Sequence, residues 1–327
     1  MRVLLTGASG FVGHHTARAL AAAGHDLRLL ARAGSDLAPL ADLDFERVDV
    51  PLGGPDPAPF ADAMAGQDAV VHVAGVTVAT DRDAFRRVNA EATDALARAA
   101  VAAGVGRFCY VSSLAAQGPS RDGRPAPPDA PSHPVSAYGR SKSEGEVAVL
   151  ARAGEMHVQV IRPPLVYGPR DLGLLPFFRM ARWRFIMRLG DGRNRLSVIY
   201  GPDLADAIAA LLAQRAGGPA VFHISDGDGP YDWRTMIDAL AAAFGHRLLV
   251  IPVPGGGFAA LARAGVALAR LRGGRPLIDE ARVAEMRQTG WLAEGDRLST
   301  ATGWAPATSL EEGLAATLRW YRDNGWL

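Results

Sequence analysis

The 327-residue sequence lacks the features that define several large classes of protein. Its single cysteine, Cys109, excludes an internal disulfide and a cysteine-based metal cluster, and it suits a reducing compartment. No apolar run reaches the roughly 20 residues that a membrane-spanning helix needs. The 35 Lys and Arg residues nearly balance the 34 Asp and Glu residues, so the charge gives no indication of a nucleic-acid partner.

Two further absences narrow the expected location and chemistry. The chain starts at once with a strand-like run at 2–5, which leaves no room for a signal peptide. The eight histidines show no metal-ligand spacing, and we interpret His72 and His223, which lie in apolar runs, as packed residues. We therefore expect a soluble cytoplasmic protein without a metal site, for which peripheral contact with a membrane stays open.

What the sequence does contain is a regular alternation of strand-like and helix-like segments. Strand-like runs recur at 2–5, 27–30, 45–50, 69–74, 107–112 and 157–161, and alanine-rich helical stretches lie at 11–23, 83–103 and 137–153. Such alternation predicts a parallel sheet covered by helices on both faces. We predict an α/β fold with a Rossmann-type doubly wound sheet, whose ligands bind beyond the carboxyl ends of the strands.

The alternation loosens in the second half of the chain, which indicates two domains. The pattern of residues 1–165 predicts a dinucleotide-binding domain. The chain is expected to return to this domain at about 197–226, through a strand, a helix and a further strand. Residues 166–196 and 227–327 then form a smaller, discontinuous substrate-binding lobe. Pro202 predicts the start of the returning helix, with Asp203 or a neighbour as its cap.

The first strand runs into a glycine-rich segment. Gly7 permits a tight turn, Gly10 lets backbone approach a pyrophosphate, and Gly13 lets helix and strand pack closely. The amides that start the following helix would point at the phosphates. A glycine triplet alone often marks only a tight turn, but its place between a strand and a helix predicts a dinucleotide loop. The loop consists of Thr6, Gly7, Ser9, Gly10, Phe11, Val12 and Gly13.

The ends of the next three strands indicate which dinucleotide binds. Arg32 stands where an NAD-specific site would present an acid to the ribose 2′-hydroxyl, and an arginine can pair with a 2′-phosphate. We therefore expect NADP(H) to be preferred over NAD(H); a solvated surface arginine is the alternative. Asp49 and Val50 are candidate contacts on the adenine side, and Ala74 and Gly75 leave room for backbone close to the cofactor.

Tyr138 and Lys142 are the candidate catalytic pair. Four residues apart on a helix, their side chains share one face, and an ammonium beside a phenol lowers the phenol pKa from ~10 toward the working pH. Such a tyrosine can exchange a proton with a carbonyl or alcohol oxygen, whereas the plain alternative is an exposed pair on a surface helix. Ser113, which ends a strand below a Pro- and Asp-rich loop at 118–134, can reach the same oxygen.

Together these motifs resemble the extended short-chain dehydrogenase/reductase family, which includes nucleotide-sugar epimerases and dehydratases. The matching segments are 6–13, Ser112-Ser113, Tyr138-x-x-x-Lys142, 88–93, 162–170, 203–205, 310–314 and Trp320-Tyr321. The resemblance implies that Tyr138 is the acid/base, that Lys142 binds the nicotinamide ribose and that Ser113 positions the substrate oxygen.

The resemblance carries further expectations around this centre. It implies that Pro163, Pro164 and Val166 border the nicotinamide. Asn89 either supports the site from behind or is a satisfied core amide. Family members often dimerise through four helices, which 83–103 and 137–153 could supply, so a homodimer is an expected partner.

Two positions bear on the substrate. Leu165 stands where nucleotide-sugar enzymes of the family usually carry an asparagine, and steroid-type and dihydroflavonol-type ketone reductases generally lack that asparagine. We therefore expect an NADP(H)-dependent reductase of an apolar, lipid-derived ketone, similar to bacterial ceramide reductases. Arg195 matches an arginine that holds the diphosphate in sugar-nucleotide relatives, so an epimerase or dehydratase is the alternative. A non-catalytic sensor is disfavoured, because Tyr138 and Lys142 are both present.

Residues 171–188 are predicted to form a loop and a helix, with four arginines interleaved with Trp, Phe and Met. One interpretation is an amphipathic helix with its apolar face on the core. The other is a lid that admits an apolar substrate or lies on an anionic lipid surface. The stretch 258–271 also ends in arginines and could extend that surface.

Overall fold

The computed structural model describes residues 1–79, 82–189, 192, 194–214, 220–253 and 284–327. Its centre is a seven-stranded sheet in the order β11-β6-β5-β4-β1-β2-β3, in which every pairing is parallel. The strands are β1 Arg2–Thr6, β2 Asp26–Ala31, β3 Phe45–Asp49, β4 Ala69–His72, β5 Arg107–Val111, β6 His157–Arg162 and β11 Val221–His223. The order reverses between β1 and β4, which is where such sheets bind dinucleotides. The predicted fold class and all six predicted strands are confirmed.

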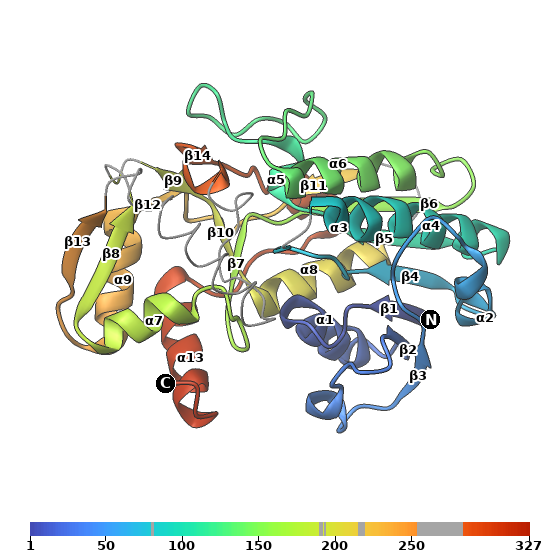
Figure 1. Ribbon diagram of the computed structural model, residues 1–327, viewed down its shortest axis with the longest axis horizontal. Helices are drawn as coiled ribbons and strands as arrows, with labels where there is room; N and C mark the ends of the chain where they lie inside the picture. The colour runs from blue at the N-terminus through green and yellow to red at the C-terminus, as the bar shows by residue number, and fades with distance from the viewer. Residues whose placement is uncertain (80–81, 190–191, 193, 215–219, 254–283) are drawn as a thin grey trace.

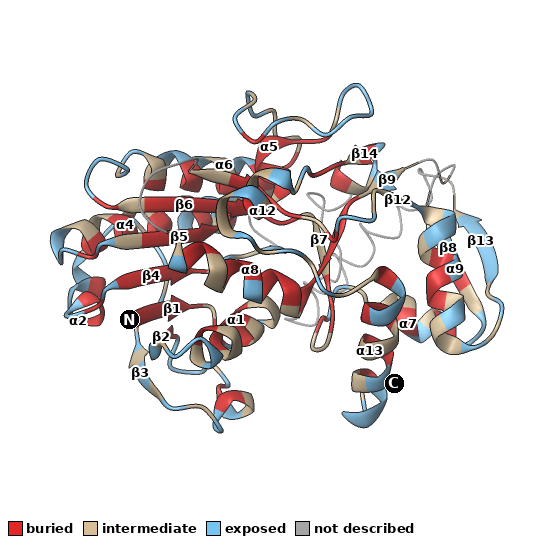
Figure 2. Cartoon of the chain, turned by 180° about the vertical axis from the view of Figure 1, so that it is seen from behind, coloured by how far each residue is buried: buried red, intermediate tan, exposed pale blue. Residues whose placement is uncertain are grey.

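Helices cover both faces of this sheet (Figure 1). Leu5 faces a core shared with α1 (Phe11–Ala22) and α8 (Gly201–Ala213), whereas the adjacent Leu4 faces a core shared with α4 (Ala92–Ala102). Because both faces of the central strands are buried, β1, β4, β5 and β6 consist mainly of apolar residues, and Figure 2 shows them as largely buried. The edge strand β3 is largely exposed.

The other elements of this half are mostly short, except for α6. They are η1 Ala38–Leu40, η2 Ala58–Phe60, α2 Ala61–Met64, α3 Arg82–Arg86, η3 Arg87–Glu91, α5 Leu114–Gln117 and α6 Ala137–Leu150. The helix predicted over 83–103 is interrupted: η3 is one turn of π-helix between α3 and α4. Cys109 is buried in the middle of β5, and burial raises the pKa of its thiol to about 12.

The remaining strands form three small sheets that join distant parts of the chain. β7 (Leu165–Tyr167) pairs with β10 (Val198–Tyr200), β9 (Arg195–Leu196) lies between β12 (Tyr231–Asp232) and β14 (Gly290–Trp291), and β8 (Phe185–Leu189) pairs with β13 (Leu249–Val253). The helices beside them are α7 Leu175–Arg182, α9 Trp233–Phe244, α12 Asp296–Thr302 and α13 Leu310–Asp323. Residues of β7, β8, β10, α7, α9 and α13 form a third apolar core.

Three local predictions for this half were wrong. The segment 171–188 is not only loop and helix, because 185–189 form β8 by pairing with β13. The strand predicted at the start of the returning segment is broken at Ser197, whose hydroxyl accepts the Ala293 amide at 3.0 Å. Asp203 does not cap α8; its carboxylate accepts the amides of Ala307 and Thr308 instead, at 3.1 and 2.9 Å. The stretch 258–271 lies outside the described residues.

Within the described ranges, no helix combines the length and the apolar character needed to cross a membrane. The same ranges contain no group of three His, Cys, Asp or Glu side chains placed to hold a metal ion. His72 and His223 are both buried in the sheet, as expected of packed residues.

Candidate active site

The glycine-rich loop forms a cradle at the end of β1. Gly7 has φ 82°, in the left-handed region, and a Cβ there would lie 2.7 Å from the Ala74 nitrogen. A Cβ at Gly13 would lie 2.0 Å from the Gly7 oxygen, so α1 can approach β1 only at a glycine. Gly10 starts α1 without a side-chain cap, which leaves first-turn amides for an anion. The cradle therefore fits the pyrophosphate of a dinucleotide.

Behind the loop, His72 links Thr6 to the π-helical turn. The Thr6 hydroxyl accepts the Ala74 amide at 3.1 Å, so its own proton goes to His72 Nδ1 at 2.7 Å. Nε2 then carries the ring proton and donates to Thr93 Oγ1 at 2.9 Å. Burial, and then the charge of Lys142, lower the His72 pKa to about 3, which keeps the ring neutral. The Thr6 side chain is thus occupied within the protein, and only its backbone is left to face a cofactor.

Asn89 sits in the π-turn, and its amide group is fully used. Oδ1 accepts the Val76 amide at 2.8 Å, while Nδ2 donates to the Val76 oxygen at 2.9 Å and to Ser141 Oγ at 3.1 Å. Its backbone oxygen accepts from Thr93 Oγ1 and from the Tyr110 hydroxyl, at 2.9 and 3.3 Å. A π-turn frees backbone groups in this way and is frequent at functional sites. Asn89 ties α6 to the segment that follows β4, and its buried, fully hydrogen-bonded amide agrees with both expected alternatives, a support for the site and a satisfied core amide.

Lys142 is buried at the centre of the arrangement. Its Nζ donates to the Val111 oxygen at 2.7 Å and lies 4.5 Å from the centroid of the Tyr110 ring. A Cβ at Gly75 would be 3.5 Å from this Nζ, so the amine lies beside the end of β4. Burial lowers the Lys142 pKa to about 7, although the Glu146 carboxylate opposes the shift. Lys142 is also the only lysine in the chain.

Two glycines on α6 let this helix pack closely against its neighbours. A Cβ at Gly139 would lie 2.3 Å from the Ala115 oxygen, so the first turn of α6 rests directly on α5. Ser113 is the N-cap of α5, where its oxygen accepts the Ala115 amide at 3.2 Å and its hydroxyl proton stays available. The half-buried Tyr138 ring packs edge-on against Phe85, with centroids 6.1 Å apart. Gly145 makes a second close contact, with Asn89 and Tyr110.

The structure separates the two adjacent serines. Ser112 is buried and donates to Glu146, which also forms a buried two-point ion pair with Arg162 at 2.6 and 2.9 Å. Arg162 Nη1 donates in addition to the Pro128 oxygen at 2.8 Å, which fastens the 118–134 loop to β6. This cluster was not predicted, although Glu146 follows Lys142 by one helical turn. Ser113 is the serine that remains free to meet a substrate.

A buried contact joins α6 to the C-terminal part of the chain. Ser136, the N-cap of α6, accepts the Gly139 amide at 2.8 Å and donates to the Glu285 carboxylate at 2.6 Å. Nearby, the Ser120 amide donates to the Gly290 oxygen at 2.9 Å. Glu285 is therefore held by Ser136, which precedes Tyr138 by two positions in the sequence. Nothing in the sequence around Glu285 indicates this contact.

The candidate adenine side lies at the ends of β2 and β3. Arg32 is exposed, as an arginine reading a 2′-phosphate must be. Asp49 is exposed too, but Arg47 binds it at 2.9 Å and also donates to the oxygens of Arg32 and Ala33, at 3.3 and 3.0 Å. Arg47, which was not predicted, thus fixes the turn that presents Arg32. Val50 is half-buried next to Asp49.

The other predicted residues are placed as follows. Ser9 and Gly10 are exposed in the loop, Val12 is half-buried, and the Phe11 ring packs beneath Gly201 and Gly168 as a structural contact. Pro163 is buried, and its oxygen accepts the Leu114 amide at 2.8 Å, whereas Pro164 and Val166 are half-buried. Leu165 is half-buried opposite Val198, and the exposed Arg195 is held in β9 through its backbone.

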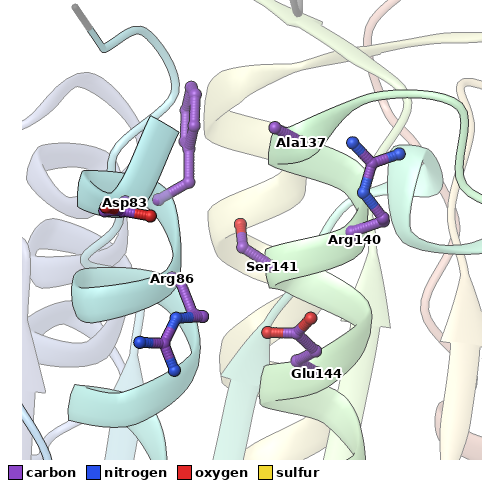
Figure 3. A pocket seen from close by; sticks show the side chains of 7 residues that line it. Asp83, Arg86, Ala137, Arg140, Ser141 and Glu144 are labelled. Atoms are coloured by element: carbon purple, nitrogen blue, oxygen red, sulfur yellow. The ribbon is translucent and has the colours of Figure 1, made fainter. Parts of the chain in front are cut away.

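A pocket lies between α3 and α6, the helix that carries Tyr138 and Lys142 (Figure 3). Its walls are Asp83, Phe85, Arg86, Ala137, Arg140, Ser141 and Glu144. Charges of both signs line it, and Phe85 connects it to the Tyr138 ring. The pocket borders the catalytic helix but does not contain the Ser113 hydroxyl.

A dinucleotide cradle at the switch point of a parallel sheet, beside a tyrosine, a buried lysine and a serine, defines an NAD(P)-dependent oxidoreductase of the short-chain type. The profile of the NAD dependent epimerase/dehydratase family matches residues 3–225. The chain belongs to this family, whose members are enzymes, and both the predicted family and the predicted enzyme class are confirmed.

Relatives extend the match over the whole chain. A "Ceramide reductase" of Caulobacter vibrioides is 32% identical over 326 residues, 99% of this chain and 96% of that protein. A "2-alkyl-3-oxoalkanoate reductase" of Stenotrophomonas maltophilia is 28% identical over 344 residues, covering 96% of this chain and 97% of that protein. The structure of dTDP-glucose 4,6-dehydratase from Streptomyces venezuelae, with NAD bound, superposes with a TM-score of 0.79 at 26% identity, covering 100% of this chain and 98% of that one.

Proposed function

We propose that the protein is an NADP(H)-dependent reductase that converts a ketone on an apolar, lipid-derived molecule to an alcohol. The observation that carries the proposal is the alignment with the ceramide reductase over nearly the full length of both chains, including the half that is not part of the seven-stranded sheet. Leu165 at the start of β7 supports it, because nucleotide-sugar enzymes of the family usually carry an asparagine there.

Each candidate residue has one task in this reaction. Bound NADPH would supply the hydride to the carbonyl carbon. Tyr138 donates its phenolic proton to the carbonyl oxygen, and the Ser113 hydroxyl donates a hydrogen bond to that oxygen and orients it. Lys142 holds its amine at the end of β4, beside the Val111 oxygen, where its positive charge favours the tyrosinate left after the transfer.

We also propose that the protein prefers NADP(H) over NAD(H) because Arg32 binds the 2′-phosphate. The Arg47 contacts that fix the Arg32 turn support it, because a pre-positioned guanidinium loses less freedom on binding a phosphate. Arg32→Glu should raise the dissociation constant for NADP⁺ by more than ten-fold and change that for NAD⁺ little. Arg28→Gln, a change at an arginine on β2 that binds Glu46, is the control. Tighter binding of NAD⁺ than of NADP⁺ by the unaltered protein rules the preference out.

The reaction is tested with NADPH and an N-acyl 3-oxo-sphingoid lipid in detergent micelles. We expect one NADPH consumed for each alcohol formed, as measured by absorbance and mass spectrometry. The same assay with UDP-glucose or dTDP-glucose should leave NADPH unchanged and yield no sugar product. Conversion of either sugar nucleotide without net NADPH consumption would replace the proposal with the epimerase or dehydratase alternative, which the exposed Arg195 favours.

We further propose a cytoplasmic homodimer that associates through α4 and α6. Val147 supports this, since it is an exposed apolar residue on the outer side of α6, and the pocket of Figure 3 adjoins the same helix. Val147→Glu should convert a dimer to a monomer in sedimentation velocity. A monomeric unaltered protein would contradict the assembly.

A further inference from the structure

The two-stranded sheet β8–β13 has one face in the core and one face in solvent. Ile186 is buried in the third core, so its strand neighbours Phe185 and Met187 point to the other side. The parallel register places Leu249 opposite Phe185 and Ile251 opposite Met187, which puts all four side chains on that outer side. Figure 1 shows the two strands at the edge of the molecule, far from the seven-stranded sheet.

This outer side is strongly apolar for an exposed surface. Leu249 is 68% exposed and Trp183, which directly follows α7, is 75% exposed. Met187 and Ile251 are exposed as well, and Figure 2 shows β13 as an exposed strand. The Leu249 amide donates to the Arg184 oxygen at 2.8 Å, which places the α7–β8 turn beside β13. We call the set Trp183, Phe185, Met187, Leu249 and Ile251 the apolar face.

The two segments that carry the apolar face are basic, although Asp171, Asp191 and Asp238 border them in the sequence. Residues 172–190 and 239–253 contain five arginines and no Asp or Glu, in a chain whose charges otherwise balance. Arg182, Arg184 and Arg247 are exposed, and no residue described in the structure forms an ion pair with them. The basic character therefore faces solvent instead of being neutralised within the protein.

The turn that carries Trp183 and Arg184 is also conformationally unusual. Arg184 has φ 65°, in the left-handed region where glycine is usual after a helix. A non-glycine residue there is disfavoured, so an arginine at this position is more readily understood if its side chain has a use.

We propose that the apolar face and its arginines form a docking surface for an anionic lipid bilayer. Exposed Trp and aliphatic side chains insert at the headgroup boundary, and the arginines bind lipid phosphates. A second copy of the chain is disfavoured as the occupant, because a two-fold interface would bring each set of arginines against its own copy. The proposal does not rest on the proposed reaction, since it concerns binding without turnover.

Flotation of the full-length protein with lipid vesicles tests the surface. We expect binding to vesicles of equal parts phosphatidylglycerol and phosphatidylcholine, at least ten-fold weaker binding to pure phosphatidylcholine, and loss of most binding in 0.5 M NaCl. Because each basic residue near an anionic surface contributes about five-fold to partitioning, Arg182→Glu combined with Arg184→Glu should reduce binding more than ten-fold. The matched control, Arg121→Glu with Arg124→Glu, reverses two exposed arginines in the 118–134 loop and should bind normally.

Trp183→Ala distinguishes insertion of side chains into the bilayer from electrostatic attraction to its surface alone. Brominated lipids should quench tryptophan fluorescence in the unaltered protein, and this quenching should be largely lost in the variant, with binding several-fold weaker. Equal binding to both vesicle types, no binding to either, or unchanged binding of the double arginine variant overturns the proposal. Concentration-dependent self-association that Trp183→Ala removes would assign the face to a second copy instead. The salt and lipid dependence of the unaltered protein decides the matter even if a variant fails to fold.

Discussion

The seven-stranded sheet and the three small sheets differ in which strands pair. Most pairings in the large sheet join strands that follow one another in the sequence, as in β1–β2, β2–β3, β4–β5 and β5–β6, although β1–β4 and β6–β11 join distant ones. In the small sheets, β9 pairs with β14 and β8 with β13, across long intervals of chain. The cofactor half of the protein is therefore defined by short motifs, whereas the other half exists only when remote segments meet.

The residues proposed for the reaction all lie in the cofactor half. The cradle, Ser113, Tyr138 and Lys142 all sit on elements of the large sheet or on helices packed against it. A chain of this kind can keep its hydride chemistry while its substrate changes, because one fold can host different substrate sites.

The largest expected effect tests whether chemistry belongs to the cofactor half. Tyr138→Phe removes the proton donor but keeps the ring against Phe85. The turnover number should fall about 10²–10⁴-fold, while the dissociation constant for NADPH stays within two-fold. Steady-state kinetics and fluorescence titration measure the two quantities. Full activity in this variant would refute the role given to Tyr138.

The next effect contrasts a buried ion pair of the large sheet with an exposed pair on α9. Glu146→Ala leaves Arg162 charged and buried, which should cost about 3–5 kcal/mol of unfolding free energy. Asp238→Ala removes the exposed partner of Arg234 and should leave the urea midpoint unchanged. Similar urea midpoints for the two variants would mean that water solvates Arg162 once Glu146 is removed, so that breaking the buried pair costs little.

The third effect is the pH dependence caused by Lys142. Its folded-state pKa of about 7 lies below the ordinary 10.5, so the unfolded chain binds more protons between these values and stability rises with pH. The unaltered protein should therefore gain stability relative to Lys142→Met as pH rises from 7 to 10.5, with a constant difference below pH 7. Urea unfolding at several pH values measures this. A single ¹³C lysine resonance reports the titration directly, and a midpoint near 10.5 would contradict the assignment.

The smallest effect concerns the contact between the two halves. Ser136→Ala removes the cap of α6 and should cost about 1 kcal/mol, as caps of this kind do. Glu285→Gln should cost less when Ser136 is absent than in the unaltered protein, because the Ser136 hydroxyl donates to this carboxylate. A double-mutant cycle on unfolding free energy and on the turnover number measures the coupling. Strictly additive effects would show that Glu285 does not act through Ser136.

The same division explains what the sequence could predict. The six strands and the glycine loop depend on neighbouring residues, so apolar runs and spacing were sufficient. β8 was missed because its partner begins at Leu249, and the π-turn was missed because helical periodicity does not reveal one inserted residue. Gly139 and Gly145 were a readable signal, since glycines inside a helix cost stability unless another backbone approaches closely. Glu285 offered no such signal.

The burial of the chain's only lysine has a consequence for how the protein is cut. A protease that cleaves after lysine has a single target in the chain, the bond between Lys142 and Ser143 in the middle of α6. Cleavage needs an extended substrate, so the bond is protected while the helix is intact and is exposed only when the helix opens. The rate at which the two fragments appear on a gel would then report how often α6 opens. Any ligand that stabilises the closed helix should slow their appearance.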